Sequence, residues 1–193
     1  MEKKNIDWSN LGFGYVQTDK RFVANFKDGA WDEGTLTEDP NIVLNECAGV
    51  LQYAQTVFEG MKAYRTADGS IQLFRPDKNM ARMNVSCDRL CIPKIDEEFA
   101  IKAIKTLVEV DKDWVPSLDG TSLYIRPYIF ATDAQVGVHP AKHLTFAIIL
   151  SPVGAYYPQG IAPVKIFVEQ KYVRAVIGGT GFTKAGANYA ISL

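Results

Sequence analysis

Hydrophobic residues recur every three or four positions in the middle of the chain, and this spacing predicts two amphipathic helices. The clearer helix begins near Asp96, which is a residue type that favours helix N-termini. Its polar face carries Lys102, Lys105 and Glu109, and its apolar stripe consists of Phe99, Ala100, Ala103, Ile104, Leu107 and Val108. The other helix follows "FRP" and places Met80, Met83, Cys87 and Leu90 on one side.

A third segment with helical spacing runs from Cys47 to Phe58. Its apolar positions are Cys47, Val50, Leu51, Ala54, Val57 and Phe58. Gly60 follows two residues after Phe58, and glycine is common just after the last turn of a helix. We therefore expect a helix that ends at Gly60.

Strand-like segments surround these helices. Two aromatic or apolar stretches turn at Lys27-Asp28-Gly29 and at Ala67-Asp68-Gly69, which is typical of β-hairpins. Longer apolar runs at 122–130, 143–153 and 164–170 predict further strands. Strands and helices that do not alternate regularly indicate an α+β fold.

The segment "GAYYPQGIAP", at 154–163, contains two glycines and two prolines and indicates a break in the fold. We expect a small α+β domain over residues 1–157, an interdomain linker over 158–170, and the truncated beginning of a larger domain over 171–193. The last segment is too short to bury a core of its own. The alternative is that it packs back on the first domain as its last elements.

The composition is that of a globular protein and argues against nucleic-acid-binding, membrane-spanning and secreted proteins. Of the 193 residues, 47% are hydrophobic, which is enough to bury a core, and the formal net charge of −1 gives no general attraction for nucleic acid or anionic membranes. The longest apolar run, "FAIIL", is too short to span a bilayer, and no signal peptide is visible. We read Cys87 and Cys91 as small core residues. With Cys47 they make an odd number of cysteines, which favours reduced thiols in the cytoplasm.

Lys184 lies in a glycine-rich stretch, "VIGGTGFTKAGANYA". A P-loop requires glycine before the lysine and serine or threonine after it, and a dinucleotide fingerprint requires glycine or alanine at the position of Lys184. Neither motif fits. Imine formation is the third possibility, because a lysine among small residues leaves room for a flat cofactor, with Tyr189 able to bind one of its oxygens. From these residues alone, a solvated loop lysine remains the alternative.

Three arginines are candidates for binding an anion. Arg126 interrupts an apolar strand, where burial is costly unless the side chain meets an anion; otherwise it points outward or pairs with Asp133. Arg82 and Arg174 are surface residues by default, but two arginines that converged on a phosphate would make a strong site. His139 and His143 have no third ligand nearby, so we expect no metal site.

Several long motifs, taken together, resemble the branched-chain amino acid aminotransferase family. They are "LQYAQTVFEGMKAY", "LFRPDKNMARM", "VDKDWVP", "TSLYIRPYIF", "LSPVGAYYP" and "GGTGFTKAGANYA", and they follow in order from about Asn25. The resemblance implies a homodimeric enzyme of fold type IV that uses pyridoxal 5′-phosphate. It implies transamination of leucine, isoleucine and valine with 2-oxoglutarate, which gives branched 2-oxo acids and glutamate.

The resemblance also assigns roles to residues. It makes Lys184 the Schiff-base lysine and the catalytic base, Arg82 and Arg174 the residues near the phosphate, and Tyr189 the partner of the pyridoxal ring oxygen. Val136 and Val138 match a loop that reaches into the partner's active site. The substrate pocket is implied to be lined by Phe58, Tyr53, Tyr124, Arg126 and, from the mobile interdomain loop, Tyr156.

Two departures from the family pattern change what is expected. Ala187 stands where the family often has a second glycine, and we expect little effect. Family members continue beyond the position of Leu193 with most of the large domain, so we expect this chain alone to be inactive. A D-amino acid aminotransferase, an aminodeoxychorismate lyase, or a non-catalytic module that binds a phosphorylated ligand through residues 178–181 are the alternative functions.

Overall fold

A computed structural model describes residues 6–157, 159–160 and 162–193. It contains one eight-stranded antiparallel sheet with the order β2-β1-β8-β7-β5-β6, in which β3 also pairs with β1 and β4 with β7. The strands are β1 (Arg21–Lys27), β2 (Ala30–Trp31), β3 (Thr35–Thr37), β4 (Thr56–Phe58), β5 (Met61–Arg65), β6 (Ile71–Leu73), β7 (Ser122–Ala131) and β8 (Leu144–Val153). The helices are α1 (Gly49–Tyr53), α2 (Pro76–Arg89), α3 (Glu97–Val110) and α4 (Gly186–Ala190), with short 3₁₀ turns at Trp8–Asn10 and Lys112–Trp114.

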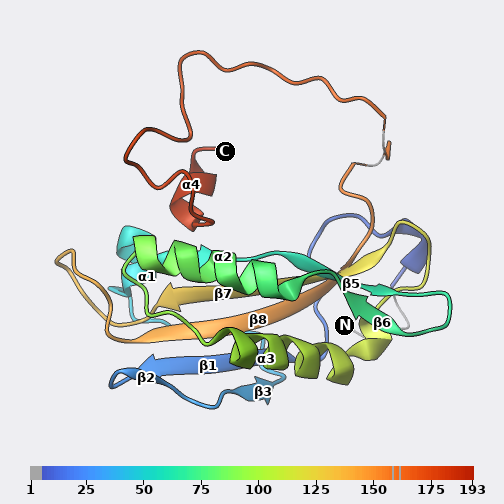
Figure 1. Cartoon of the computed structure of the whole chain (residues 1–193), viewed down its shortest axis with the longest axis horizontal. Coiled ribbons are helices and arrows are strands. Elements are labelled where there is room, and N and C mark those ends of the chain that lie inside the picture. Colours follow the sequence, from blue (N-terminus) through green and yellow to red (C-terminus); the bar gives the residue numbers. More distant parts are fainter. Residues whose placement is uncertain (1–5, 158, 161) are drawn as a thin grey trace.

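The sheet has one face that is covered by helices and one face that is more open, and the side chains of the two long central strands point to both. Strands β7 and β8 pair from Ser122↔Val153 to Ala131↔Leu144, and successive side chains alternate between the two faces. Ile125 and Ile129 point into the core with residues of α2 and α3, and Figure 1 shows both helices on this face. Tyr124, Arg126 and Tyr128 are half-buried on the opposite face.

Both predicted amphipathic helices are confirmed. Met80, Met83 and Cys87 of α2, and Ala103, Ile104 and Leu107 of α3, are buried. Burial raises the pKa of the Cys87 thiol to about 12, so Cys87 is an unreactive core residue. The reading of Cys91 as a core residue is wrong: α2 ends at Arg89, and Cys91 turns outward with a φ of 54° and is exposed.

Asp96 caps α3, because its Oδ1 accepts a 2.7 Å hydrogen bond from the backbone N–H of Phe99. We expect Asp96→Ala to lower the free energy of unfolding by about 1 kcal/mol, since that N–H loses its acceptor. Asp96→Asn keeps an oxygen acceptor and should lose much less. Urea unfolding of both variants followed by circular dichroism checks this expectation, and equal losses in the two variants would contradict it.

The predicted helix over Cys47–Phe58 is wrong over its second half. Helix α1 covers only Gly49–Tyr53, and Ala54 then adopts a left-handed conformation with a φ of 50°. Residues 56–58 form β4 because they pair with β7, where Val57 lies opposite Ile129 and is fully buried. Gly60 does not end a helix: a Cβ at this position would lie 2.4 Å from the Tyr124 hydroxyl oxygen, so a larger residue would have to displace the Tyr124 side chain.

The two predicted hairpins are confirmed. Strands β1 and β2 pair as Lys27↔Ala30 around Asp28 and Gly29, both of which have positive φ. Positive φ at both central residues is the geometry that an Asp-Gly turn favours. Strands β5 and β6 pair from Arg65↔Ile71 around the second Asp-Gly turn.

After β8 the chain leaves the sheet, and Figure 1 shows it following a long arc that returns to place α4 beside α2. The predicted strand at 164–170 is wrong, because these residues have no neighbouring strand to pair with among those that the structure describes. Ile166, Phe167 and Val168 of the arc are exposed. The chain then docks on the sheet edge through an antiparallel bridge between Val57 and Ala185.

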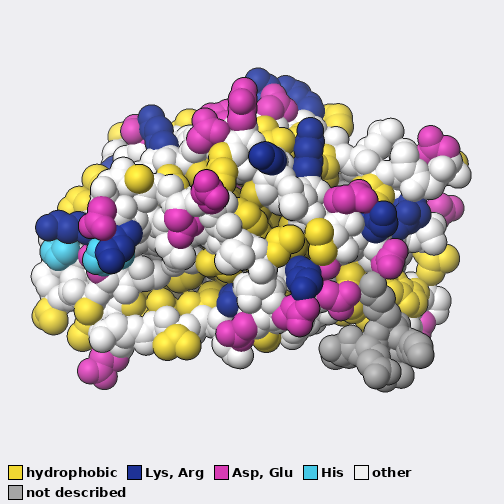
Figure 2. Space-filling view, turned by 90° about the horizontal axis from the view of Figure 1, so that it is seen from below, with side chains coloured by type: hydrophobic (Ala, Val, Ile, Leu, Met, Phe, Trp, Pro, Cys, Tyr) yellow, Lys and Arg dark blue, Asp and Glu magenta, His cyan; other side chains and the backbone are white. Residues whose placement is uncertain are grey.

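A cavity of about 660 Å³ opens between the β2–β3 segment and α3. Figure 2 shows hydrophobic side chains gathered in a band across the lower face of the molecule, between charged groups. The cavity lining includes Phe22, Trp31, Leu36, Phe99 and Ala103, and none of the predicted site residues. In the described part of the chain, none of the helices has the length and apolar character of a transmembrane span.

Candidate active site

Lys184 is fixed beside β4 by its backbone. Its carbonyl accepts a 3.0 Å hydrogen bond from the Phe58 N–H, and its own N–H donates to the Ser86 hydroxyl oxygen at 2.9 Å. The next residue, Ala185, is fully buried. The backbone position of the lysine is therefore set by β4 and α2, and its half-buried side chain takes no part in these bonds.

The amine of Lys184 lies against two aromatic rings. Its Nζ donates a 2.8 Å hydrogen bond to the Tyr189 hydroxyl and lies 4.5 Å from the centre of the Phe58 ring. The Phe58 and Tyr189 rings contact each other edge to face at 4.8 Å. The three predicted residues Lys184, Tyr189 and Phe58 thus form one cluster, in which a primary amine and a phenol are adjacent.

The loop before the lysine is shaped by a buried amide. Asn188 is only 3% exposed, and its Nδ2 donates to the carbonyls of Thr180 and Thr183 at 2.7 and 2.8 Å. The Thr180 hydroxyl donates back to Asn188 Oδ1 at 2.8 Å. Because these bonds close residues 180–188 on themselves, the loop presents Lys184 in one orientation.

Arg126 extends the cluster along β7. Its Nε and Nη2 donate to the Tyr124 hydroxyl at 3.1 and 2.8 Å, and its guanidinium lies 4.7 Å from the centre of the Phe58 ring. The alternative pairing with Asp133 does not occur, since Asp133 instead accepts from the backbone N–H of Lys142. Phe58 is therefore in contact with the cations of Lys184 and Arg126.

Arg82 lies on α2, one turn before Ser86, and forms an ion pair with a buried carboxylate. Its Nε and Nη2 donate to Glu59 Oε1 and Oε2 at 2.7 and 2.8 Å. Glu59 is fully buried, whereas half of the Arg82 side chain is exposed. The hydrogen bonds to Glu59 raise the pKa of Arg82, and the nearby Tyr189 adds to this rise.

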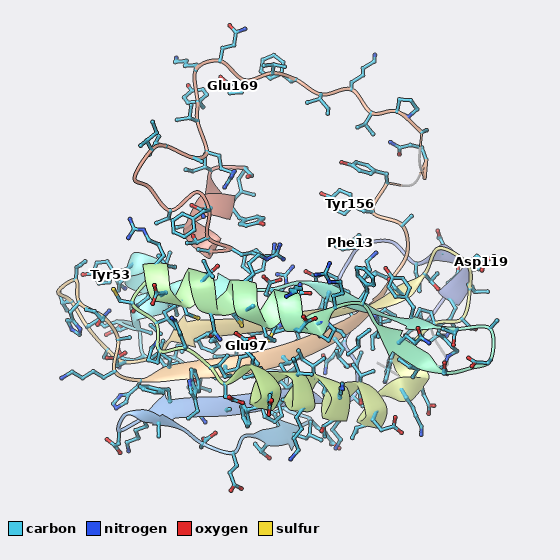
Figure 3. All side chains as sticks on the ribbon, in the orientation of Figure 1. Phe13, Tyr53, Glu97, Asp119, Tyr156 and Glu169 are labelled. Carbon is cyan, nitrogen blue, oxygen red and sulfur yellow. The ribbon has the colours of Figure 1, made fainter. Side chains whose placement is uncertain are left out.

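Two aromatic residues stand beside Tyr124. The Phe13 ring lies 5.6 Å from the Tyr124 ring and 5.1 Å from the Tyr156 ring, and Figure 3 shows Phe13 and Tyr156 side by side where the chain leaves β8. A cavity of about 220 Å³ is lined by Phe13, Tyr124 and Arg126, among others. Tyr156 thus belongs to the same region as Tyr124 and Arg126.

The remaining four predicted residues bond to other partners or are exposed. Tyr53 lies well away from Phe13 and Tyr156 in Figure 3, and its hydroxyl donates to the Val136 carbonyl. Val136 and Val138 are 82% and 80% exposed. Arg174 is exposed, and its Nη1 donates to the Gly181 carbonyl at 3.3 Å.

Sequence reasoning missed four residues of the site: Phe13, Glu59, Ser86 and Asn188. Each acts through a partner that is distant in sequence or, for Asn188, through the closed loop around it. Phe13 lies in a segment without any periodic pattern, and Ser86 was hidden on the buried face of α2. The only local signal was Glu59, a carboxylate between the apolar strand β4 and Gly60, where burial requires a cationic partner.

The chain was compared with known families and proteins. The model of the family described as amino-transferase class IV matches residues 56–174. Branched-chain-amino-acid transaminase 1 of Bacillus subtilis (strain 168) is 49% identical over 193 residues, which cover 99% of this chain and 54% of that protein. The branched-chain-amino-acid aminotransferase of Mycobacterium tuberculosis (strain ATCC 25618 / H37Rv) is 47% identical over 184 residues, which cover 94% of this chain and 50% of that protein.

The chain therefore spans about half the length of the curated relatives it matches. Among solved structures, a branched-chain aminotransferase from Thermoproteus uzoniensis with norvaline matches with a TM-score of 0.74 and 21% identity, over 91% of this chain and 54% of that one. The T.th. branched-chain amino acid aminotransferase with pyridoxamine 5′-phosphate matches with a TM-score of 0.69 and 23% identity, over 92% of this chain and 54% of that one. These two likenesses confirm the α+β fold.

Proposed function

Because this chain belongs to the class IV aminotransferases, we propose that the protein carrying it is a branched-chain amino acid aminotransferase. It transfers the amino group of leucine, isoleucine or valine to 2-oxoglutarate. The observation that carries the proposal is the Lys184 amine held against the Tyr189 hydroxyl and the Phe58 ring. The identities of 47–49% to transaminases of this specificity support the choice of substrates.

The donor set of the cluster fits pyridoxal 5′-phosphate. Lys184 offers the primary amine that an aldehyde requires, Tyr189 offers a phenol for a ring oxygen, and Arg82 offers guanidinium donors for a phosphate. When bound, this cofactor supplies an aldehyde that condenses with amines and a conjugated ring that stabilises negative charge at the substrate α-carbon. We propose Arg174 as a further residue near the phosphate.

Lys184 has two tasks in this proposal. Its Nζ would hold the cofactor covalently through the aldehyde carbon. The same Nζ would carry the proton between the substrate α-carbon and that cofactor carbon, in one direction in the first half-reaction and in the other direction in the second. Tyr189 orients the amine through the 2.8 Å hydrogen bond. The backbone bonds to Phe58 and Ser86 keep the lysine in place while its side chain moves.

The substrate side chain lies against Phe58, Tyr124 and Tyr156 in the proposed complex. These aromatic groups suit a branched aliphatic side chain, because apolar contact needs no polar partner. Glutamate is the harder substrate, since its second carboxylate needs a cation. Arg126 is our candidate for this carboxylate, because it lies over Phe58 on the same face of the sheet.

We also propose that the enzyme is a homodimer. The exposed Val136 and Val138, on the loop that Tyr53 ties down, support a contact with a partner subunit, because exposed apolar side chains at a loop tip favour contact with another surface. By this proposal the loop and Tyr53 complete the partner's substrate pocket. The odd number of cysteines supports a cytoplasmic location.

The domain division remains a proposal: a small domain at 1–157, a linker at 158–170 and the start of a larger domain at 171–193. Residues 1–5, 158 and 161 of these ranges lie outside the described residues. The change from a compact sheet to an extended arc after β8 supports the division.

A chemical test identifies the cofactor and its attachment. The full-length protein that carries this sequence should be yellow, and borohydride reduction should fix the cofactor on the peptide that contains Lys184. Peptide mass mapping after reduction measures the site of attachment. A colourless protein with unmodified Lys184 would contradict the proposal and favour a module that binds a phosphorylated ligand without catalysis.

A further inference from the structure

We propose that Glu59 is a positioning residue, which holds one edge of the Arg82 guanidinium so that its other edge faces the cofactor phosphate. This inference rests on the proposed function. The side-chain bonds of Glu59 go to Arg82 and Asn79 of α2 and to the Gly60 N–H, and not to the amine of Lys184, so Glu59 acts through Arg82. Its role is to give Arg82 one fixed orientation toward a doubly charged group.

Glu59 itself is held rigidly. Its backbone N–H donates to the Pro127 carbonyl at 2.7 Å, which ties the segment between β4 and β5 to β7. Its Oε2 accepts bonds from Asn79 Nδ2 at 2.9 Å and from the Gly60 N–H at 3.2 Å, in addition to the bond from Arg82. A fully buried carboxylate is costly unless it is paired and hydrogen-bonded, and Glu59 meets both conditions.

The geometry of the pair leaves part of the arginine available. A guanidinium has five N–H donors in a rigid fork, and Glu59 occupies the side formed by Nε and Nη2. The end formed by Nη1 and the second hydrogen of Nη2 is a second bidentate edge, and phosphate binds such an edge through two parallel hydrogen bonds. With 54% of its side chain exposed, Arg82 is accessible to a ligand.

The free edge of the Arg82 guanidinium and Lys184 are connected through Ser86 of α2. Arg82 lies one helical turn before Ser86, whose hydroxyl accepts the bond from the Lys184 N–H. The Ser86 hydroxyl also donates to the Arg82 carbonyl at 3.2 Å. The backbone of Lys184 is therefore tied to the same turn of α2 that carries Arg82, which fixes the amine and the guanidinium relative to each other, as one cofactor with an aldehyde and a phosphate requires.

The charge of Glu59 and its positioning role predict opposite effects on phosphate binding. Glu59 is an anion, so removing its charge would strengthen the attraction between Arg82 and a phosphate if electrostatics alone decided. If orientation decides, removing it weakens phosphate binding, because Arg82 then loses its fixed fork. The two effects have opposite signs.

The test compares two probes on the full-length apoprotein: pyridoxal 5′-phosphate, and pyridoxal, which has the same ring and aldehyde without the phosphate. We expect Glu59→Gln to lower the affinity for the phosphorylated probe by about tenfold, the loss typical of one weakened charge-assisted hydrogen bond. The affinity for pyridoxal should stay nearly unchanged. Titration followed by absorbance measures both dissociation constants.

Two further variants separate the explanations. Glu59→Asp keeps the charge but withdraws the carboxylate by one methylene, so it should also lower the ratio of the two affinities if position matters. Glu109→Gln makes the same charge change at an exposed residue that pairs with Lys112, and it should leave the ratio unchanged. Glu59→Asp also provides the test if Glu59→Gln does not fold.

An unchanged ratio in both Glu59 variants, or tighter binding of the phosphorylated probe, would overturn the inference. An equal loss for both probes would also overturn it, because that result indicates a general structural role. If the wild-type protein binds neither probe, the proposed function fails, and the inference fails with it. If the wild type discriminates between the probes and the variants discriminate equally well, only the role of Glu59 is lost.

Discussion

Replacing Lys184 with alanine is expected to lower the rate of transamination from leucine to 2-oxoglutarate by about 10³-fold or more. A positioned general base alone contributes roughly 10²- to 10⁴-fold, and Lys184 is also the proposed point of covalent attachment. Tyr189 cannot replace Lys184. Its hydroxyl accepts the hydrogen bond from the Lys184 amine, and the tyrosine side chain has no amine. Steady-state kinetics of the full-length protein measure the loss.

The fold should survive this change, because the lysine is anchored by its backbone. The bonds from Phe58 N–H to the Lys184 carbonyl and from the Lys184 N–H to Ser86 do not involve the side chain. The thermal unfolding midpoint of Lys184→Ala should therefore stay close to that of the wild type. Lys171→Ala removes the same charge from the exposed arc and serves as the control, with activity retained.

Turnover by Lys184→Ala at a rate near that of the wild type would contradict the assignment of the catalytic base. A loss of activity together with loss of the folded state would leave the role of the side chain to the borohydride mapping, in which the wild-type protein must carry the cofactor on Lys184. Both measurements address the same amine by independent chemistry.

The parts of the fold that the sequence predicted are those in which local pattern and tertiary structure agree. Helix α3 has an N-cap at Asp96 and a continuous apolar stripe, so no long-range contact was needed to identify it. Each β-hairpin was likewise identified from the Asp-Gly residues of its own turn. The prediction for Thr56–Phe58 failed because the helical spacing of this segment competed with pairing to β7, a strand far along the chain, where Thr56 lies opposite Phe130 and Val57 opposite Ile129.

The residues of the candidate site also fall into those that the sequence predicts and those that it does not. Lys184 and Tyr189 are five residues apart, so one motif contained both members of a hydrogen-bonded pair. Glu59 and Ser86 were not predicted, because their meaning depends on Arg82 and Lys184, which reach them only through the folding of α2 against β4. Spacing along a chain identifies residues that act with their neighbours and misses residues that act across the fold.

Arg126→Leu is expected to separate the two substrates. The catalytic efficiency, kcat/KM, for glutamate should fall by about 10- to 100-fold, since a hydrogen bond to a charged group contributes about 1.5–3 kcal/mol. The efficiency for leucine should change much less, because leucine has no second carboxylate and its side chain needs only apolar contact. The Arg126→Leu substitution leaves an apolar side chain over Phe58, so the pocket keeps its lining.

The geometry of Arg126 makes the conservative variant informative. Its Nε and Nη2 both bond to the Tyr124 hydroxyl, so Tyr124 holds one edge of the fork and leaves the other donors for a ligand. Arg126→Lys keeps the charge but loses the fork, and we expect a loss for glutamate between those of the wild type and Arg126→Leu. Equal losses for leucine and glutamate in Arg126→Leu would contradict the assignment, because the arginine would then support the pocket as a whole instead of one carboxylate.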